Sequence, residues 1–208
     1  MSTERYERLR AERPELFCNE PDGIDILTEP DAVAAAGGVL YEDQYLMLVR
    51  DPVRFPGGEE GTYIRSMSPY REPGCVVLPL LDGGVVLVEH FRHATRSWHW
   101  EVPRGFGTAG LSDEENAAKE LWEEIGAVPR EVVALGVVHP DTGMTAEAVR
   151  LFAVRIASTG DLDRAEGIRR CVTVPFAEAE AMVADGRITD GFTVAALMRA
   201  RLAGLVAG

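Results

Sequence analysis

The stretch that decides the fold is EVPRGFGTAGLSDEENAAKELWEEIGA, from Glu101 to Ala127. It joins a short strand-like segment, a glycine-rich loop and an amphipathic helix. Ser112 is a favourable N-cap, and Glu115 follows three residues later, which is the spacing of a capping box. Gly126 is a natural stop after the last helical turn. The stretch therefore predicts a helix from Asp113 to Ile125.

Three carboxylates gather near the end of this helix, at Glu120, Glu123 and Glu124. The opposite face, which we expect to contact the core, carries Ala118, Leu121, Trp122 and Ile125. Acidic helix faces are usually solvated, and Lys119 lies one turn from both Glu115 and Glu123, so it can pair with either. The alternative is a site for Mg²⁺ or Mn²⁺, because these hard cations prefer oxygen ligands. Helix spacing alone does not decide between the two interpretations.

The loop and helix together resemble the Nudix box, G-x5-E-x7-R-E-U-x-E-E-x-G-U, in which U is aliphatic. The matching positions are Gly105, Glu120, Leu121, Glu123, Glu124, Gly126 and, approximately, Ala127. Two positions differ, because Leu111 stands where the family has its first Glu and Lys119 where it has Arg. In the family these two residues mainly brace the loop against the helix. We therefore expect the differences to affect loop geometry and rate more than metal binding.

Segments outside the box resemble the ADP-ribose pyrophosphatase branch of the family. They are VVLPLLDGGVVLVEHFRH and WHWEVPRGF before the helix, and HPDTGMTAEAVRLFAV and GRITDGFTVAAL after it. The resemblance covers residues 38 to about 201. It implies metal-dependent hydrolysis of the diphosphate bond of a nucleoside diphosphate linked to another group, with ADP-ribose, cleaved to AMP and ribose 5-phosphate, as the first candidate.

The resemblance also implies roles for particular residues. The metal ligands for Mg²⁺ or Mn²⁺ are Glu120, Glu124, Glu123 and the Arg104 carbonyl; the catalytic residues are Glu147, as general base, and Glu123; the substrate-binding residues are Arg92, Arg104 and Gly105. From the residues alone, Arg92 serves equally well as the partner of an acid such as Glu101. Glu147 is alternatively an exposed loop acid.

Other functions remain open at this level. Within the enzyme class, GDP-mannose and other nucleotide sugars compete with ADP-ribose. A catalytically weak, Nudix-like protein that binds such a nucleotide without hydrolysing it is the alternative from another class. Leu111 and Lys119 keep that alternative open, whereas the intact set of glutamates favours the enzyme.

The alternation of strand and helix patterns predicts an α+β fold, a mixed α/β sandwich, and the resemblance specifies a Nudix fold with an N-terminal β arm. We expect a helical N-terminal extension over residues 1–36, a β arm over 37–74 and the Nudix hydrolase domain over 75–208. Because this branch commonly forms dimers that exchange such arms, the resemblance implies a homodimer.

Composition limits the binding partners and the cellular compartment that we expect for the protein. The 208 residues carry a net charge of −13, which disfavours nucleic-acid binding. No apolar run is long enough to cross a membrane, and the charged N-terminal segment has no signal-peptide core. Three widely spaced cysteines predict reduced thiols. These features predict a cytoplasmic protein with a nucleoside diphosphate-sugar substrate and neither a nucleic-acid nor a membrane partner.

Overall fold

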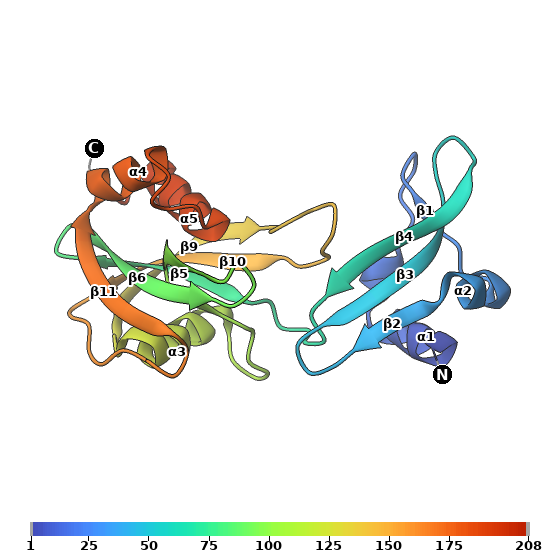
Figure 1. The fold of residues 1–208 in the computed structure, drawn as a ribbon, viewed down its shortest axis with the longest axis horizontal. Coiled ribbons are helices and arrows are strands. Elements are labelled where there is room, and N and C mark those ends of the chain that lie inside the picture. Colours follow the sequence, from blue (N-terminus) through green and yellow to red (C-terminus); the bar gives the residue numbers. More distant parts are fainter. Residues whose placement is uncertain (1, 207–208) are drawn as a thin grey trace. The chain divides into compact units, whose positions relative to one another are not determined.

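A computed structural model describes residues 2–206, and their contacts divide the chain into two compact units (Figure 1). Unit 1 consists of the chain up to Pro69 together with Asp141–Glu147. Unit 2 consists of Tyr70–Pro140 and the chain from Ala148 onward. The short segment 141–147 is therefore an excursion from unit 2 that packs with the N-terminal residues.

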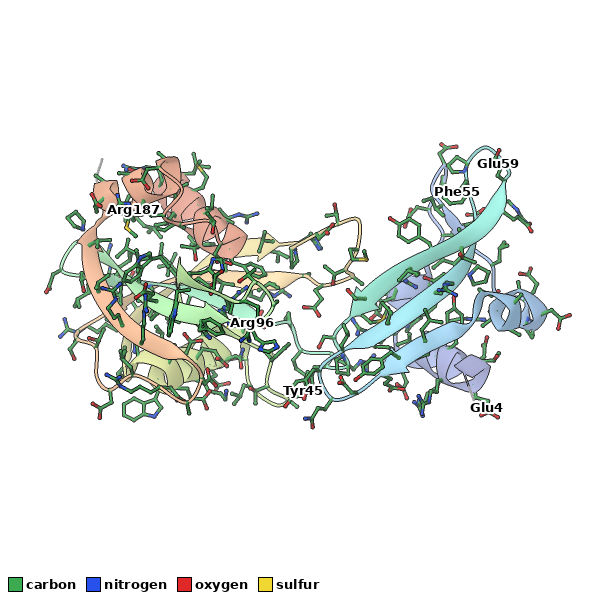
Figure 2. The ribbon with its side chains drawn as sticks, in the orientation of Figure 1. Glu4, Tyr45, Phe55, Glu59, Arg96 and Arg187 are labelled. Atoms are coloured by element: carbon green, nitrogen blue, oxygen red, sulfur yellow. The ribbon has the colours of Figure 1, made fainter. Side chains whose placement is uncertain are left out.

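Unit 1 is a four-stranded antiparallel sheet with helices on one face. Its elements are α1 (Ser2–Glu12), the 3-10 helix η1 (Pro14–Phe17), β1 (Asp25–Ile26), α2 (Pro30–Ala36), β2 (Gly38–Glu42), β3 (Met47–Arg54) and β4 (Glu60–Met67). The strand β3 pairs with the other three strands. Its hairpin with β4 turns through Phe55 and Glu59, where the Phe55 N–H donates to the Glu59 carbonyl over 2.8 Å (Figure 2).

A buried polar group fastens the first helix of unit 1 to the sheet. The carboxylate of Asp51 on β3 accepts from the Tyr6 hydroxyl at 2.6 Å and from Arg65 Nε at 2.7 Å. Arg65 Nη1 also donates to the Leu16 carbonyl at 2.7 Å. Because every partner is satisfied, this polar cluster orders α1 and η1 without leaving a buried charge alone.

The segment 141–147 continues the sheet of unit 1 beyond β4. The Ser66 N–H donates to the Met144 carbonyl at 2.8 Å, and the Ala146 N–H donates to the Ser66 carbonyl at 3.0 Å. Glu147, the predicted general base, is the last residue of this segment and belongs to unit 1.

Unit 2 contains a seven-stranded mixed sheet in which β11, β6, β5, β10 and β9 follow one another. Its elements are β5 (Cys75–Leu81), β6 (Gly84–Arg92), β7 (Ser97–Glu101), β8 (Arg104–Gly105), α3 (Asp113–Ile125), β9 (Pro129–Val138), β10 (Val149–Ile156), β11 (Ile168–Pro175), α4 (Phe176–Ala184) and α5 (Gly191–Leu202). The central pair β5 and β10 is parallel, and β7 and β8 pair with β6 and β5 at the side of this path.

Helices cover both faces of the sheet in unit 2 (Figure 1). On one face, α3 buries Ala117, Leu121 and Ile125 against the sheet. On the other, α4 and α5 pack against the alternate side chains of the same strands. A sheet buried on both sides explains why CVVLPLL reads as a continuous apolar run. The predicted mixed α/β sandwich is confirmed.

The helix α3 has the predicted bounds but not the predicted buried face. Ser112 and Glu115 form the capping box, and Gly126 ends the helix with φ 60°. Trp122, expected in the core, is 62% exposed, whereas Glu120 and Glu124 are buried. Leu121 lies at the centre of the buried face. Successive residues of an α-helix are rotated by about 100°, so Glu120 and Trp122 point to opposite sides of that face. The glycine-rich loop covers the glutamate side, which helical periodicity cannot reveal.

Two predictions from composition concern the chain as a whole. Within residues 2–206, no helix is both long and apolar enough to span a membrane. Cys18, Cys75 and Cys171 are free thiols, as predicted.

Candidate active site

The helix α3 carries two buried carboxylates. Glu120 is 6% and Glu124 is 1% exposed. Glu124 Oε1 accepts the Arg104 N–H at 3.2 Å. Its Oε2 is buried and has no hydrogen-bond partner in the described part of the chain. A buried carboxylate oxygen without a partner is costly, so this position is suited to a cation.

Burial changes the protonation of both groups. It raises the pKa of Glu124 to about 8, with added repulsion from the nearby charges of Glu166 and Glu120 and opposed by the Arg104 N–H and the Arg92 charge. Burial also raises the pKa of Glu120, against the opposing effect of Lys119. Two adjacent oxygen donors that resist ionisation in the absence of a cation fit a hard divalent metal.

The glycine-rich loop lies directly on these carboxylates. A Cβ on Gly105 would lie 1.9 Å from Glu120 Oε2, so any larger residue here would displace the Glu120 carboxylate from its present position. The side chain of Asn116 on α3 donates to the Phe106 carbonyl at 3.1 Å and thereby ties loop to helix. Asn116 is buried and was not recognised in the sequence, because an amide in a polar helical turn has no distinctive pattern.

The third glutamate of the predicted set faces elsewhere. Lys119 Nζ lies 2.6 Å from Glu123 Oε2 and 3.1 Å from Glu120 Oε1. Its alternative partner, Glu115, is engaged in the capping box instead. No group of three metal-ligating side chains is found among the residues that the structure describes. Glu120 and Glu124 are therefore buried together, whereas the Glu123 side chain is 45% exposed and paired with Lys119.

Two arginines share one buried acid beside this pair. Arg92 donates to Glu101 Oε2 from Nε at 2.7 Å and from Nη2 at 2.5 Å. Arg104 Nη2 lies 3.4 Å from the same oxygen and 3.7 Å from Asp190 Oδ1. Of the two interpretations of Arg92, the structure shows the ion pair with Glu101. This acid fixes both guanidinium groups close to the buried carboxylates.

Glu166, which the sequence did not single out, also belongs to this neighbourhood. It lies in the exposed loop before β11, and its charge raises the pKa of both Glu120 and Glu124. Burial lowers the pKa of the neighbouring His90 to about 4, with the charges of Arg92 and Arg104 acting in the same direction. In the sequence Glu166 is a lone acid between Ala165 and Gly167, a context without a recognisable signal.

The chain is similar to several known hydrolases. The GDP-mannose pyrophosphatase of Yersinia enterocolitica serotype O:8 / biotype 1B is 33% identical over 163 residues, covering 71% of this chain and 84% of the relative. The CMP-5'-(N-acetyl-N-hydroxy-3-aminopropyl)phosphonate hydrolase of Streptomyces rubellomurinus is 27% identical over 170 residues, covering 76% and 77%. A crystal structure of an ADP compounds hydrolase superposes with a TM-score of 0.72 at 19% identity, covering 90% of this chain and 98% of that one.

The model of the NUDIX domain matches residues 71–192, more than half of the chain. The chain belongs to the NUDIX family and is a pyrophosphohydrolase of that family.

Proposed function

We propose that the protein hydrolyses the diphosphate bond of a nucleoside diphosphate sugar with the help of Mg²⁺ or Mn²⁺. The observation that carries the proposal is the pair of buried carboxylates, Glu120 and Glu124, beneath the glycine-rich loop. A substrate diphosphate repels such a pair unless cations lie between them. Holding those cations is the role that best accounts for the cost of burying two acids.

The ligands we propose are Glu120, Glu124, Glu123 and the Arg104 carbonyl. A bound divalent ion screens the diphosphate and lowers the pKa of a coordinated water. Glu124 Oε2 is the preformed position, because it is buried without a partner among the described residues. Glu123 joins the set only after its contact with Lys119 opens.

Two residues compete for the role of general base. Glu147 carries it by resemblance to the family, and Glu166 by its electrostatic coupling to both buried carboxylates. We expect E166Q to lower kcat by about 10²–10⁴ if Glu166 abstracts the proton. E147Q is the matched variant, and the larger loss of kcat identifies the base.

Arg92, Arg104 and Gly105 are the proposed substrate-binding residues. The shared partner Glu101 holds both guanidinium groups in place, so they are oriented before a substrate arrives. Gly105 allows the loop backbone to approach a phosphate closely.

GDP-mannose and ADP-ribose are the two leading substrates. GDP-mannose is supported by the relatives of 30–33% identity, which carry the name GDP-mannose pyrophosphatase. ADP-ribose is supported by the motifs around the Nudix box. We also propose that unit 1 is a separate subdomain and that two copies form a dimer through it, in a cytoplasmic enzyme.

A panel of substrates tests the proposal. ADP-ribose, GDP-mannose, ADP-glucose, NADH and diadenosine polyphosphates are incubated with Mg²⁺, Mn²⁺ or EDTA, and the products are separated by chromatography. We expect metal-dependent release of a nucleoside monophosphate and a sugar phosphate from one of the first two. Equal turnover in EDTA, or none from any member, would contradict the proposal.

A further inference from the structure

Lys119 is the only lysine in the chain. Its side chain is 35% exposed, and its ammonium group lies between the carboxylates of Glu120 and Glu123. The distances of 3.1 and 2.6 Å are those of direct, charge-assisted hydrogen bonds. A single cation thus pairs with two of the acids that we propose as metal ligands and offsets one of their two negative charges.

The sequence explains why this cation is directed toward the acids. At the position where the Nudix box has its first Glu, this chain has Leu111, which offers no charge. Glu115, the remaining acid one turn away, is held by the backbone of Ser112 at 2.8 Å. The ammonium group of Lys119 therefore takes its partners from Glu120 and Glu123.

We propose that Lys119 is an internal counter-cation that occupies the metal-binding carboxylates and must withdraw before a divalent ion binds. The inference rests on the proposed metal site. A divalent ion on Glu120 and Glu123 competes with the ammonium group for the same oxygens and is repelled by it. Lys119 consequently raises the metal concentration that the enzyme requires, and it limits repulsion among the acids when metal is scarce.

Isothermal titration of Mg²⁺ into the intact chain and its variants tests this directly. We expect K119Q to bind Mg²⁺ about three- to tenfold more tightly than the wild type, because an ion pair of this exposure is modest in strength and its loss removes a like charge. K119R keeps the charge and is expected to bind within about twofold of wild type.

R155Q is the matched control. Arg155 pairs with Glu131 between exposed positions on β10 and β9, so R155Q makes the same change in net charge elsewhere in unit 2. Its Mg²⁺ affinity is expected to equal that of wild type. If R155Q gained as much Mg²⁺ affinity as K119Q, the gain would be a general effect of net charge and the inference would be wrong.

The lone lysine also offers a readout that leaves Lys119 itself unchanged. Reductive methylation with ¹³C-formaldehyde labels only Lys119 and the terminal amino group, and it preserves the charge. We expect Mg²⁺ to shift the Lys119 methyl signal toward the position that it has in an E120Q/E123Q variant, in which both partners have lost their charge.

The outcomes separate the inference from the function on which it rests. Saturable Mg²⁺ binding with an unmoved methyl signal, or with equal affinity in K119Q, overturns the role of Lys119 and leaves the metal site standing. Absence of saturable Mg²⁺ binding to wild type overturns the metal site and the inference together.

Discussion

Replacing Glu124 with Gln tests whether burial of this carboxylate creates the repulsion that a cation relieves. Glu124 is 1% exposed, and burial raises its pKa from 4.5 to about 8. Between these values the folded protein retains a proton that the unfolded chain has released. The free energy of unfolding therefore falls as pH rises through this window. At pH 8 the loss amounts to at most about 5 kcal/mol.

Gln is neutral across the whole window, and its Oε1 still accepts the Arg104 N–H. Its Nε2 occupies the position of the unpartnered Oε2, and an unpaired buried donor costs about 1–3 kcal/mol. We therefore expect E124Q to be more stable than metal-free wild type by about 2–3 kcal/mol at pH 8. The corresponding rise in Tm is about 4–10 °C at pH 8. At pH 5 the wild type has lost only about 1 kcal/mol, so the unpaired donor leaves E124Q equal to wild type or up to about 2 kcal/mol less stable.

The assay is thermal unfolding in EDTA at pH 5, 6, 7 and 8, repeated with Mg²⁺. Mg²⁺ is expected to raise the Tm of wild type most at pH 8, because the metal needs the ionised carboxylate, and to leave E124Q unchanged. E131Q is the control, because it removes an exposed acid and shows how the loss of one negative charge alone changes Tm. A wild-type Tm that stays level or rises from pH 5 to pH 8 in EDTA would refute the reasoning.

Three further predictions follow from the packing of particular residues. G105A places a Cβ 1.9 Å from Glu120 Oε2 and should weaken Mn²⁺ binding, measured by calorimetry, at least tenfold. G57A is the control, because a Cβ there meets nothing within 4 Å. Equal Mn²⁺ affinities of the two variants would contradict the loop geometry. E101Q deprives Arg92 and Arg104 of their shared acid and should cost about 2–3 kcal/mol in urea unfolding, less than a fully buried pair because both guanidinium groups retain some contact with water; unchanged stability would show that other groups hold the arginines. Y6F keeps the ring against Phe17 but removes the donor to Asp51. It should speed hydrogen exchange in α1 about fivefold, which corresponds to about 1 kcal/mol. Exchange is the suitable measurement because all three tryptophans lie in unit 2 and cannot report on unit 1 by fluorescence; they are Trp98, Trp100 and Trp122.

Local chemistry made α3 predictable to the residue. Its N-cap, capping box and glycine stop are short-range signals whose partners lie within one turn. The sandwich followed from strand patterns interleaved with helices, and from the resemblance to the Nudix family. The sequence pattern did not reveal that the loop folds over the helix and buries Glu120 and Glu124.

Long-range placement accounts for the remaining differences. Trp122 was assigned to the core by its place in the helical periodicity, yet it is 62% exposed. Glu166 is brought to the buried carboxylates by the path of the loop before β11, more than forty residues from α3 in the chain. The roles of all the predicted site residues stay predictions, because the resemblance supplied them and no observed contact tests them.

Diffraction from crystals of the full chain soaked in Mn²⁺ would locate the metal. We expect an anomalous peak about 2.0–2.3 Å from carboxylate oxygens of Glu120 and Glu124, with Lys119 turned away from them. A peak coordinated by other residues, or no peak beside Glu124 at saturating Mn²⁺, would contradict the claim that these acids are buried in order to hold a metal.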